Sequence, residues 1–303
     1  MSVEVSTTSL TSCCSLSELF FSYGNTLPTH RIAHSKHGGL FQPTMTQAIR
    51  LLSDPHATTA PSPEGVSRSS DDPTPHPNLP SSDPFTSGEL TYSTNGKDTF
   101  PAPSAYPSRR FSWVHIFPEG MIHQHPNKVM RYFKWGVARL ILEAEPCPDV
   151  LPIWIDGPQE VMHGNRSWPR PLPRAGKDVS VTFGDLVDTE KVFGPFRQRW
   201  NDLKAKQKQK RLRRLPVEVA SLDETTESMG ELDDDDLKYG REAEQLRIDV
   251  TMAVRNEVLK VRRTCGLSDE DPKRGLAETF RAEGGRDAGR EGEMKDGSVV
   301  KEM

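Results

Sequence analysis

The sequence predicts an α/β fold in which a mixed or parallel sheet is covered by helices. Three apolar runs of strand length predict the sheet, at Trp113–Phe117, Val150–Ile155 and Asp178–Gly184. Between and after these runs, apolar residues recur at helical spacing. Stretches rich in Pro, Ser and Gly interrupt the pattern. The folded part is therefore expected to be much smaller than the 303 residues suggest.

The composition supports one modest domain interrupted and flanked by disordered polymer. Only 34% of the residues are hydrophobic and 27% are charged, and the chain has 25 prolines and 22 glycines. The net charge of -4 argues against a nucleic-acid partner. The sequence has neither a run of about 18 apolar residues nor a signal-peptide pattern. Any membrane contact is therefore predicted to be peripheral.

The stretch Trp113–Gly120 is predicted to be a buried strand that stops at a functional loop. Val114, Ile116 and Phe117 favour a pleated backbone, and Pro118 cannot donate to a sheet ladder. In α/β sheets, ligands bind at the carboxyl ends of strands, where this pattern places Glu119. The alternative is an ordinary tight turn with a solvated glutamate.

A helix is predicted over Asn127–Ala144, with Pro126 in its first turn. With the apolar runs on either side, it predicts a parallel βαβ unit. The opposite face is basic and is solvated by default, although its cations could also meet an anionic ligand. Trp154 and Trp168 are predicted to pack. The apolar stripe comprises Met130, Phe133, Val137, Leu140, Ile141 and Ala144, and the basic face comprises Lys128, Arg131, Lys134 and Arg139.

Two further helices are predicted from apolar spacing. Thr44 can cap the first, and the second follows an acidic block and ends near Gly266. The apolar positions are Met45, Ala48, Ile49 and Leu52 in the first helix and Leu246, Val250, Val254, Val258 and Val261 in the second.

The sequence predicts neither a metal site nor a cofactor. The four cysteines form no CxxC pair, and His34 and His37 have the right spacing for two ligands on a helix but no third ligand. Gly38-Gly39 also break the helical pattern there.

Two charged blocks precede the last helix, the basic run Lys204–Arg214 and the acidic run Asp223–Asp236. Such blocks are usually solvated, and pairing between them is an open alternative. The basic run could also lie on an anionic membrane, at about 1 kcal/mol per cation, or serve in nuclear targeting.

The predicted organisation is a disordered N-terminus (1–17), a domain in two parts (18–53 and 111–203), a disordered insertion (54–110), a charged linker (204–236), an amphipathic helix (237–266) and a disordered tail (267–303).

Several of these segments together resemble the glycerolipid acyltransferase superfamily and, within it, the tafazzin family of the fungal type. His115-Ile-Phe-Pro-Glu-Gly120 combined with Phe133-Lys-Trp-Gly136 carries the resemblance, and Val150–Ile153 agrees with it. Gly24–Leu52 and Leu237–Ala243 resemble the preceding family segment and the fungal C-terminal extension. The resemblance covers about 18–53 and 111–263.

The resemblance implies a phospholipid–lysophospholipid transacylase that remodels cardiolipin acyl chains and needs no cofactor. Its implied partners are phospholipids and lysophospholipids, namely cardiolipin, monolysocardiolipin and phosphatidylcholine. The implied location is peripheral, on mitochondrial membranes facing the intermembrane space.

Family chemistry starts from a His-x4-Asp motif, in which histidine is the general base and aspartate orients it. None of the nine histidines here has an aspartate five places later. Asp71-Asp72 lie in the insertion without a suitably placed histidine. We therefore expect an incomplete acyltransferase-like domain that lacks the N-terminal segment with this motif and is catalytically impaired, with no catalytic residue assigned.

By resemblance, Arg31 and the loop Phe117, Pro118, Glu119 and Gly120 would bind the lipid headgroup. A guanidinium binds phosphate in a bidentate way, and Gly120 lets backbone N–H groups approach. Ionised Glu119 would orient Arg31 or accept a hydrogen bond from a glycerol hydroxyl.

Two non-enzymatic alternatives stay open. The chain could be a lipid-surface or partner-binding protein that uses Lys204–Arg214 and the helix Leu246–Val261. It could also be a soluble nuclear protein with a basic targeting run.

Overall fold

The computed structural model covers the predicted strands and helices but not the whole chain. The described residues are 2–6, 26–31, 35–53, 91–102, 112–120, 122–169, 172–213, 229–276, 292–293 and 299–301. His34 and most of the predicted insertion and tail lie outside these residues.

Short strands form several small sheets. β1 (Ser2–Ser6) lies between β2 (Thr26–Pro28) and β5 (Trp113–Ile116) and is parallel to both. β7 (Ile153–Asp156) is antiparallel to β8 (Ser180–Phe183). The predicted α/β class is confirmed, with parallel and antiparallel strands in separate sheets. The other strands are β3 (Thr91–Tyr92) paired with β4 (Phe100–Pro101), and β10 (Val299–Lys301) paired with β6 (Ile122–Gln124) and β9 (Gly292–Glu293).

The predicted parallel βαβ unit is wrong. Among the described strands, β5 pairs with β1, whereas β7 pairs with β8. Apolar runs show that a segment is a strand, but the choice of partner depends on segments distant in sequence. β1 itself falls within residues 1–17, which were predicted to be disordered, and it obtains its hydrogen bonds from β2 and β5.

The helix predicted over Asn127–Ala144 is half the predicted length. α3 spans only Gly136–Glu143, and residues 128–134 form neither helix nor strand. The predicted apolar stripe is nevertheless buried in full, including Met130 and Phe133 in this irregular part. The backbone of this part bonds to side chains of other segments instead of to itself, as the site below shows.

The basic face of the same region is not solvated as a whole. Arg139 is 1% exposed and forms an ion pair with Glu143, and it also donates to the carbonyls of Leu40 and Gly230. Arg131 is buried as well, whereas Lys134 is exposed.

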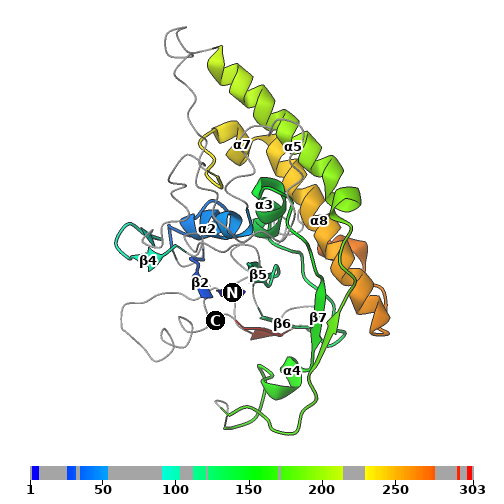
Figure 1. The fold of residues 1–303 in the computed structure, drawn as a ribbon. Coiled ribbons are helices and arrows are strands. Elements are labelled where there is room, and N and C mark those ends of the chain that lie inside the picture. The colour runs from blue at the N-terminus through cyan, green and yellow to red at the C-terminus, as the bar shows by residue number, and fades with distance from the viewer. Residues whose placement is uncertain are drawn as a thin grey trace, which may run out of the picture.

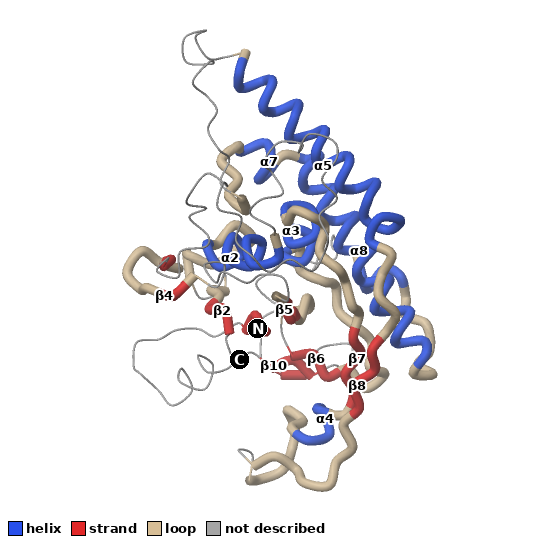
Figure 2. Tube along the Cα trace, in the orientation of Figure 1, coloured by secondary structure: helices blue, strands red, loops and turns tan. Residues whose placement is uncertain are grey.

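Helices form the main body, on one side of the strands (Figures 1 and 2). α5 (Thr189–Leu212) packs along α8 (Arg241–Thr264). Each of these two helices also contacts α3 and α7 (Asp235–Tyr239). Phe193 and Trp200 of α5 are fully buried in this core. The stripe predicted on the last helix is confirmed: Leu246, Val250, Val254 and Val261 are buried, and Val258 is partly buried.

The basic run predicted as part of a charged linker is instead the second half of α5. Two of its lysines contact acidic residues on neighbouring helices, Lys210 with Asp236 at 2.5 Å and Lys206 with Glu242 at 3.8 Å. Both pairs are exposed to solvent, so each stabilises the fold by at most about 1 kcal/mol. The alternative of pairing between the charged blocks is therefore confirmed for Asp236.

The tail predicted from residue 267 begins with ordered contacts. A 3-10 turn, η2, spans Pro272–Gly275, and the side chain of Glu270 is 1% exposed. Buried arginines of α8 hold this carboxylate, a contact that composition could not reveal.

α2 (Pro43–Leu52) forms a second, smaller core with β2 and α3. Met45, Ala48 and Ile49 are buried as predicted, but Leu51 is more buried than Leu52. Thr44 does not cap the helix, because its hydroxyl donates to the Pro28 carbonyl and Gln42 holds the cap position.

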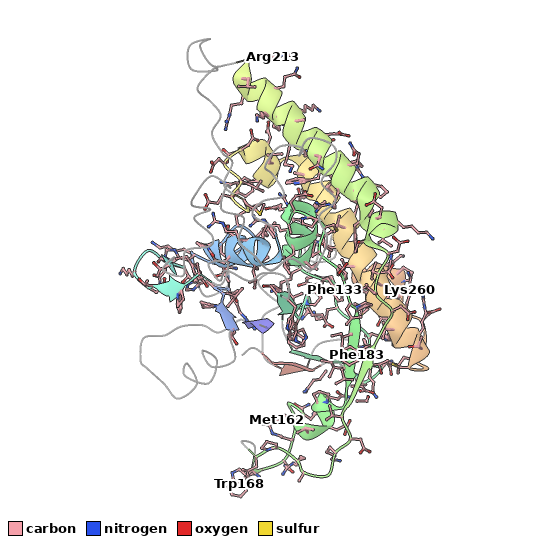
Figure 3. All side chains as sticks on the ribbon, in the orientation of Figure 1. Phe133, Met162, Trp168, Phe183, Arg213 and Lys260 are labelled. Atoms are coloured by element: carbon pink, nitrogen blue, oxygen red, sulfur yellow. The ribbon has the colours of Figure 1, made fainter. Side chains whose placement is uncertain are left out.

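The β7–β8 pair carries an arm that extends away from the helical body (Figure 3). α4 (Pro158–Val161) begins the arm. Trp168 was predicted to pack but is 86% exposed, whereas Trp154 packs against the main core as predicted. None of the described helices has the length and hydropathy needed to cross a membrane.

Candidate functional site

The candidate loop follows a strand that is buried on one face only. Val114 and Ile116 of β5 pack against the α2 core. Trp113, His115 and Phe117 alternate with them on the opposite face, and the His115 and Phe117 rings lie 4.6 Å apart. Trp113 and Phe117 are about half exposed. β5 is therefore half-buried, and its aromatic face is open next to the loop.

The turn after β5 is fixed by backbone geometry. Gly120 has φ +67°, a region that favours glycine, and its N–H donates to the Phe117 carbonyl at 3.0 Å. The Pro118 carbonyl accepts from the Lys134 N–H at 2.7 Å. This hydrogen bond connects the loop to segment 128–134.

Lys134 lies directly over Gly120. A Cβ at position 120 would stand 2.7 Å from Cδ and Cε of Lys134, and 3.0 Å from its Nζ. The glycine thus leaves room for an exposed ammonium group above the loop. A cation at this position can meet an anionic ligand, whereas sequence reasoning placed Lys134 on a helix face.

The carboxyl group of Glu119 points inward, to the segment that follows. It accepts a hydrogen bond from the Arg131 N–H at 3.4 Å. Burial raises its pKa to about 7, while the Arg131 hydrogen bond and the charges of Arg131 and Arg255 oppose the rise and Glu270 adds to it. Glu119 therefore exchanges a proton near neutral pH and lies at the edge of a buried charge cluster.

Two arginines of α8 donate hydrogen bonds to the backbone carbonyls of residues 127–131. Arg255 donates to the carbonyls of Met130 and Arg131, both at 3.0 Å. Arg262 donates to the carbonyls of Lys128 at 3.1 Å and Asn127 at 3.3 Å. These donors replace the helix hydrogen bonds that the segment does not make, because buried carbonyl groups need partners.

Glu270, which follows α8 in the sequence, completes the cluster. Its carboxylate binds Arg255 Nη2 at 2.5 Å and Arg262 Nε at 3.1 Å. It also accepts from the Met130 N–H at 2.7 Å. All three charged side chains are at most 2% exposed. We call Arg255, Arg262 and Glu270 the arginine clamp.

Arg31 lies beyond the carboxyl end of β2. Because β2 and β5 are both parallel to β1, their following loops leave the sheet at the same edge. Leu27 and Ile116 are level with each other, since both pair with Val5. Two strand spacings separate β2 from β5, about 10 Å. The sheet thus places Arg31 and the Glu119 loop on one edge, as α/β ligand sites require.

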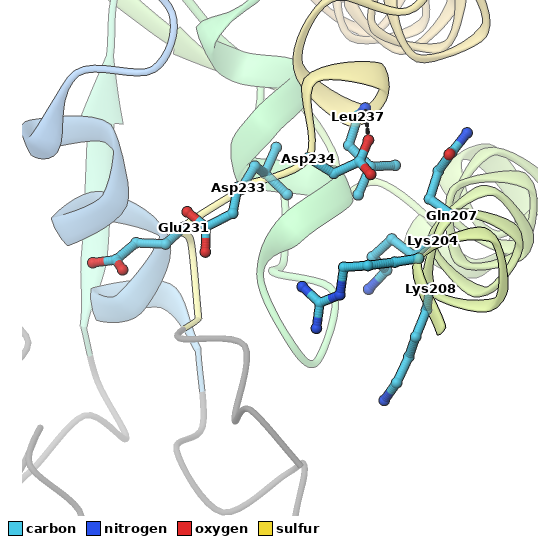
Figure 4. A pocket seen from close by; sticks show the side chains of 9 residues that line it. Lys204, Gln207, Lys208, Glu231, Asp233, Asp234 and Leu237 are labelled. Atoms are coloured by element: carbon cyan, nitrogen blue, oxygen red, sulfur yellow. Dashed lines mark hydrogen bonds between the residues drawn. The ribbon is translucent and has the colours of Figure 1, made fainter. Parts of the chain in front are cut away.

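The described residues contain no candidate metal centre, and a cleft lies apart from the loop after β5. No group of three His, Cys, Asp or Glu side chains within them could hold a metal. The cleft lies between α5 and the start of α7 (Figure 4). Cations of α5 face acidic residues across it, including Asp234, which caps α7 through the Leu237 N–H. Its mixed charge does not suit a lipid phosphate as well as Lys134 does.

Comparison with known proteins gives relatives of one kind. No family model matches the chain. It is 32% identical to tafazzin of Saccharomyces cerevisiae over 170 residues, which cover 54% of this chain and 40% of the yeast protein. It is 34% identical over 88 residues to the taffazin of Dictyostelium discoideum, over 28% of this chain and 29% of that protein.

The chain is similar to tafazzins and, more widely, to other acyltransferases. A match to N-acylphosphatidylethanolamine synthase of Arabidopsis thaliana, 39% identical over 79 residues, agrees with the wider acyltransferase relationship. That match covers 25% of this chain and 28% of the plant protein. The chain spans less than half the length of the curated relatives it matches.

In this tafazzin relative, sequence reasoning missed the residues that hold the site together. The signal was present in part: Arg255 and Arg262 are seven residues apart on α8 and adjoin its apolar stripe at Val254 and Val261. A charge on a buried helix face needs a buried partner. Nothing in the local sequence, however, identifies Glu270 as that partner.

Proposed function

We propose that this chain is the lipid-binding part of a phospholipid–lysophospholipid transacylase that remodels cardiolipin acyl chains. Its substrates would be phospholipids and lysophospholipids, among them cardiolipin, monolysocardiolipin and phosphatidylcholine. The observation that carries the proposal is the loop after β5, where Lys134 lies over Gly120 at the carboxyl edge of the strand. Its relatives named tafazzin support the same conclusion.

Each site residue has a distinct proposed role. Lys134 would contact the headgroup phosphate, and Arg31 would bind it in a bidentate way from the same sheet edge. Phe117 and Pro118 would form the apolar wall beside the glycerol backbone. Glu119, turned toward Arg131, would position the loop rather than touch the phosphate.

Acyl transfer also needs a base to take the proton of the acceptor hydroxyl as it attacks the ester carbonyl. No histidine in this chain has the His-x4-Asp spacing. We therefore propose that the chain holds lysophospholipid but transfers acyl groups poorly. Its proposed location is peripheral, on mitochondrial membranes facing the intermembrane space.

Binding of a short-chain lysophospholipid below its micelle concentration tests the site. We expect Lys134→Ala to weaken binding roughly tenfold, the loss of one charge-assisted contact of about 1.5 kcal/mol. Lys206→Ala, at an exposed lysine on α5, is the matched control and should bind normally. Equal affinity of wild type and Lys134→Ala would refute the assignment.

A transacylation assay tests the activity separately. With phosphatidylcholine as donor and monolysocardiolipin as acceptor, the 303-residue chain should fall far below yeast tafazzin. Activity comparable to the yeast protein would show that a base outside the His-x4-Asp pattern does the work.

A further inference from the structure

We propose that the arm between β7 and β8, described over residues 158–169 and 172–179, inserts its tip into the interface of an anionic lipid bilayer. The tip consists of Met162, Trp168 and Leu172. This inference extends the proposed function by naming the surface that meets the membrane. It rests on exposure, charge and shape, each independent of the candidate headgroup site.

The arm projects beyond the rest of the described structure. Figure 3 shows Met162 and Trp168 at the end opposite Arg213, which marks the far end of α5. The tip therefore reaches furthest from the helical body in this direction.

Polar contacts hold the arm in shape while its apolar side chains stay outside. The Arg174 N–H donates to the Val161 carbonyl at 3.0 Å, and Arg174 Nη2 donates to the Ser167 carbonyl at 2.5 Å. Gln124 bonds to the Met162 carbonyl at 3.1 Å and to the Gly164 N–H at 2.8 Å. The position of Trp168 is thus set by its neighbours in the loop, without packing of its own ring.

The apolar exposure at the tip is large. Trp168 is 86% exposed, Leu172 58% and Met162 41%. None of the three belongs to a hydrophobic core cluster of the described residues. A tryptophan left almost wholly in water forfeits the stabilisation of burial, and exposed apolar patches of this kind mark interaction surfaces.

Charge identifies the occupant. The arm has four cations, Arg166, Arg170, Arg174 and Lys177. Its two acidic residues, Glu160 and Asp178, lie near the ends of the arm, so the segment from Met162 to Lys177 carries only positive charge, although the whole chain has a net charge of -4. A basic segment around exposed Trp and Leu matches an anionic lipid surface, where cations meet headgroups and the indole ring lies at the interface.

A second copy of the chain fits the tip of the arm less well than an anionic bilayer does. In a two-fold dimer the same surface meets itself, so two tips of equal positive charge would face each other. A bilayer avoids this repulsion and also accommodates a tip with no concave partner.

Vesicle flotation tests the proposal with the full chain. Binding should be strong to phosphatidylcholine vesicles that contain phosphatidylglycerol, weak to phosphatidylcholine alone, and reduced by salt. Trp168→Ser and Leu172→Ser should each weaken binding several-fold, together roughly tenfold or more. Leu186→Ser is the matched control, because Leu186 is 61% exposed but lies after β8, outside the arm.

Depth-dependent quenching by brominated lipid gives a second readout. The chain has five tryptophans, and the quenched part of the fluorescence should vanish in Trp168→Phe. Lys177→Glu should weaken vesicle binding more than Lys191→Glu, an exposed lysine on α5.

Three results would overturn the proposal: vesicle binding unchanged in the Trp168→Ser, Leu172→Ser double variant, quenching unchanged in Trp168→Phe, or self-association through Trp168 without vesicle binding. Failure of the headgroup site is distinguishable. It would abolish binding of monomeric lysophospholipid, whereas the Trp168, Leu172 and Lys177 variants would still reduce flotation.

Discussion

The arginine clamp buries charged side chains, whereas the arm exposes apolar side chains to solvent. In the clamp, three charged side chains are buried among backbone carbonyls and one another. In the arm, Trp168 and Leu172 face water while polar contacts shape the loop. The difference shows that burial follows the availability of partners rather than the polarity of the residue.

The two regions also differ in what their shape depends on. Side chains of α8 and Glu270 satisfy the backbone of segment 128–134, so this segment should lose its shape if they are removed. The arm depends on bonds among its own residues, such as Arg174 to Ser167, and on two bonds to Gln124. Substitutions at its tip should leave the fold unchanged.

The largest expected effect comes from breaking the clamp. Glu270→Gln leaves Arg255 and Arg262 buried without a counter-charge, which should lower the free energy of unfolding by about 3–5 kcal/mol. Chemical denaturation measures the loss. Asp269→Asn removes only the exposed pair with Arg263 and should change stability by less than about 1 kcal/mol. Equal effects of the two substitutions would mean that the clamp does not hold the fold.

The second effect is on pH dependence. Because the pKa of Glu119 is raised to about 7 in the folded chain, above its ordinary value of 4.5, the folded state retains a proton that the unfolded state has lost. The contribution of neutral Glu119 to stability is therefore present at low pH and is lost as pH rises from 4.5 through about 7.

Glu119→Gln should remove this contribution to the pH dependence. Relative to the variant, the wild-type chain should lose stability across that window and change little above it. Denaturation curves at a series of pH values would show this. A constant difference between the two proteins would place the Glu119 carboxyl in water.

A smaller effect is expected at the loop. Gly120→Ala places a Cβ against Lys134 and imposes a positive φ on alanine, so we expect a loss of about 1–2 kcal/mol and a displaced Lys134. Gly96→Ala has φ +80° but open space around the new Cβ. Gly96→Ala should therefore lose less stability than Gly120→Ala. The difference between the two losses measures the cost of the contact between the new Cβ and Lys134. Thermal melts of both variants provide the comparison.

The smallest effect is expected at the tip of the arm. Trp168→Ser should change the free energy of unfolding by less than about 0.5 kcal/mol, because the ring is 86% exposed. The same denaturation assay that reports Glu270→Gln serves here. A loss of more than 1 kcal/mol, on the order of a core substitution, would show that the ring is packed in solution.

The sequence by itself determined features encoded within one helix or one turn. The stripe from Leu246 to Val261 predicted α8, and Pro118 with Gly120 predicted a sharp turn after β5. It also placed Arg31 and Glu119 in one candidate site, which stays a prediction. These features depend on side-chain periodicity and on backbone freedom, which are local properties.

Only the tertiary structure decided which segments meet. Glu270 bonds to Met130 across 140 positions, and with the two arginines it satisfies the backbone of 128–134, which is irregular where its periodicity predicted a helix. The tertiary structure also decided that β7 pairs with β8. It decided that Trp168 is exposed as well, which no local pattern indicated. The reason is physical: a buried charge or an unpaired strand edge is stabilised by whichever partner the fold brings to it, and that partner can lie anywhere in the chain.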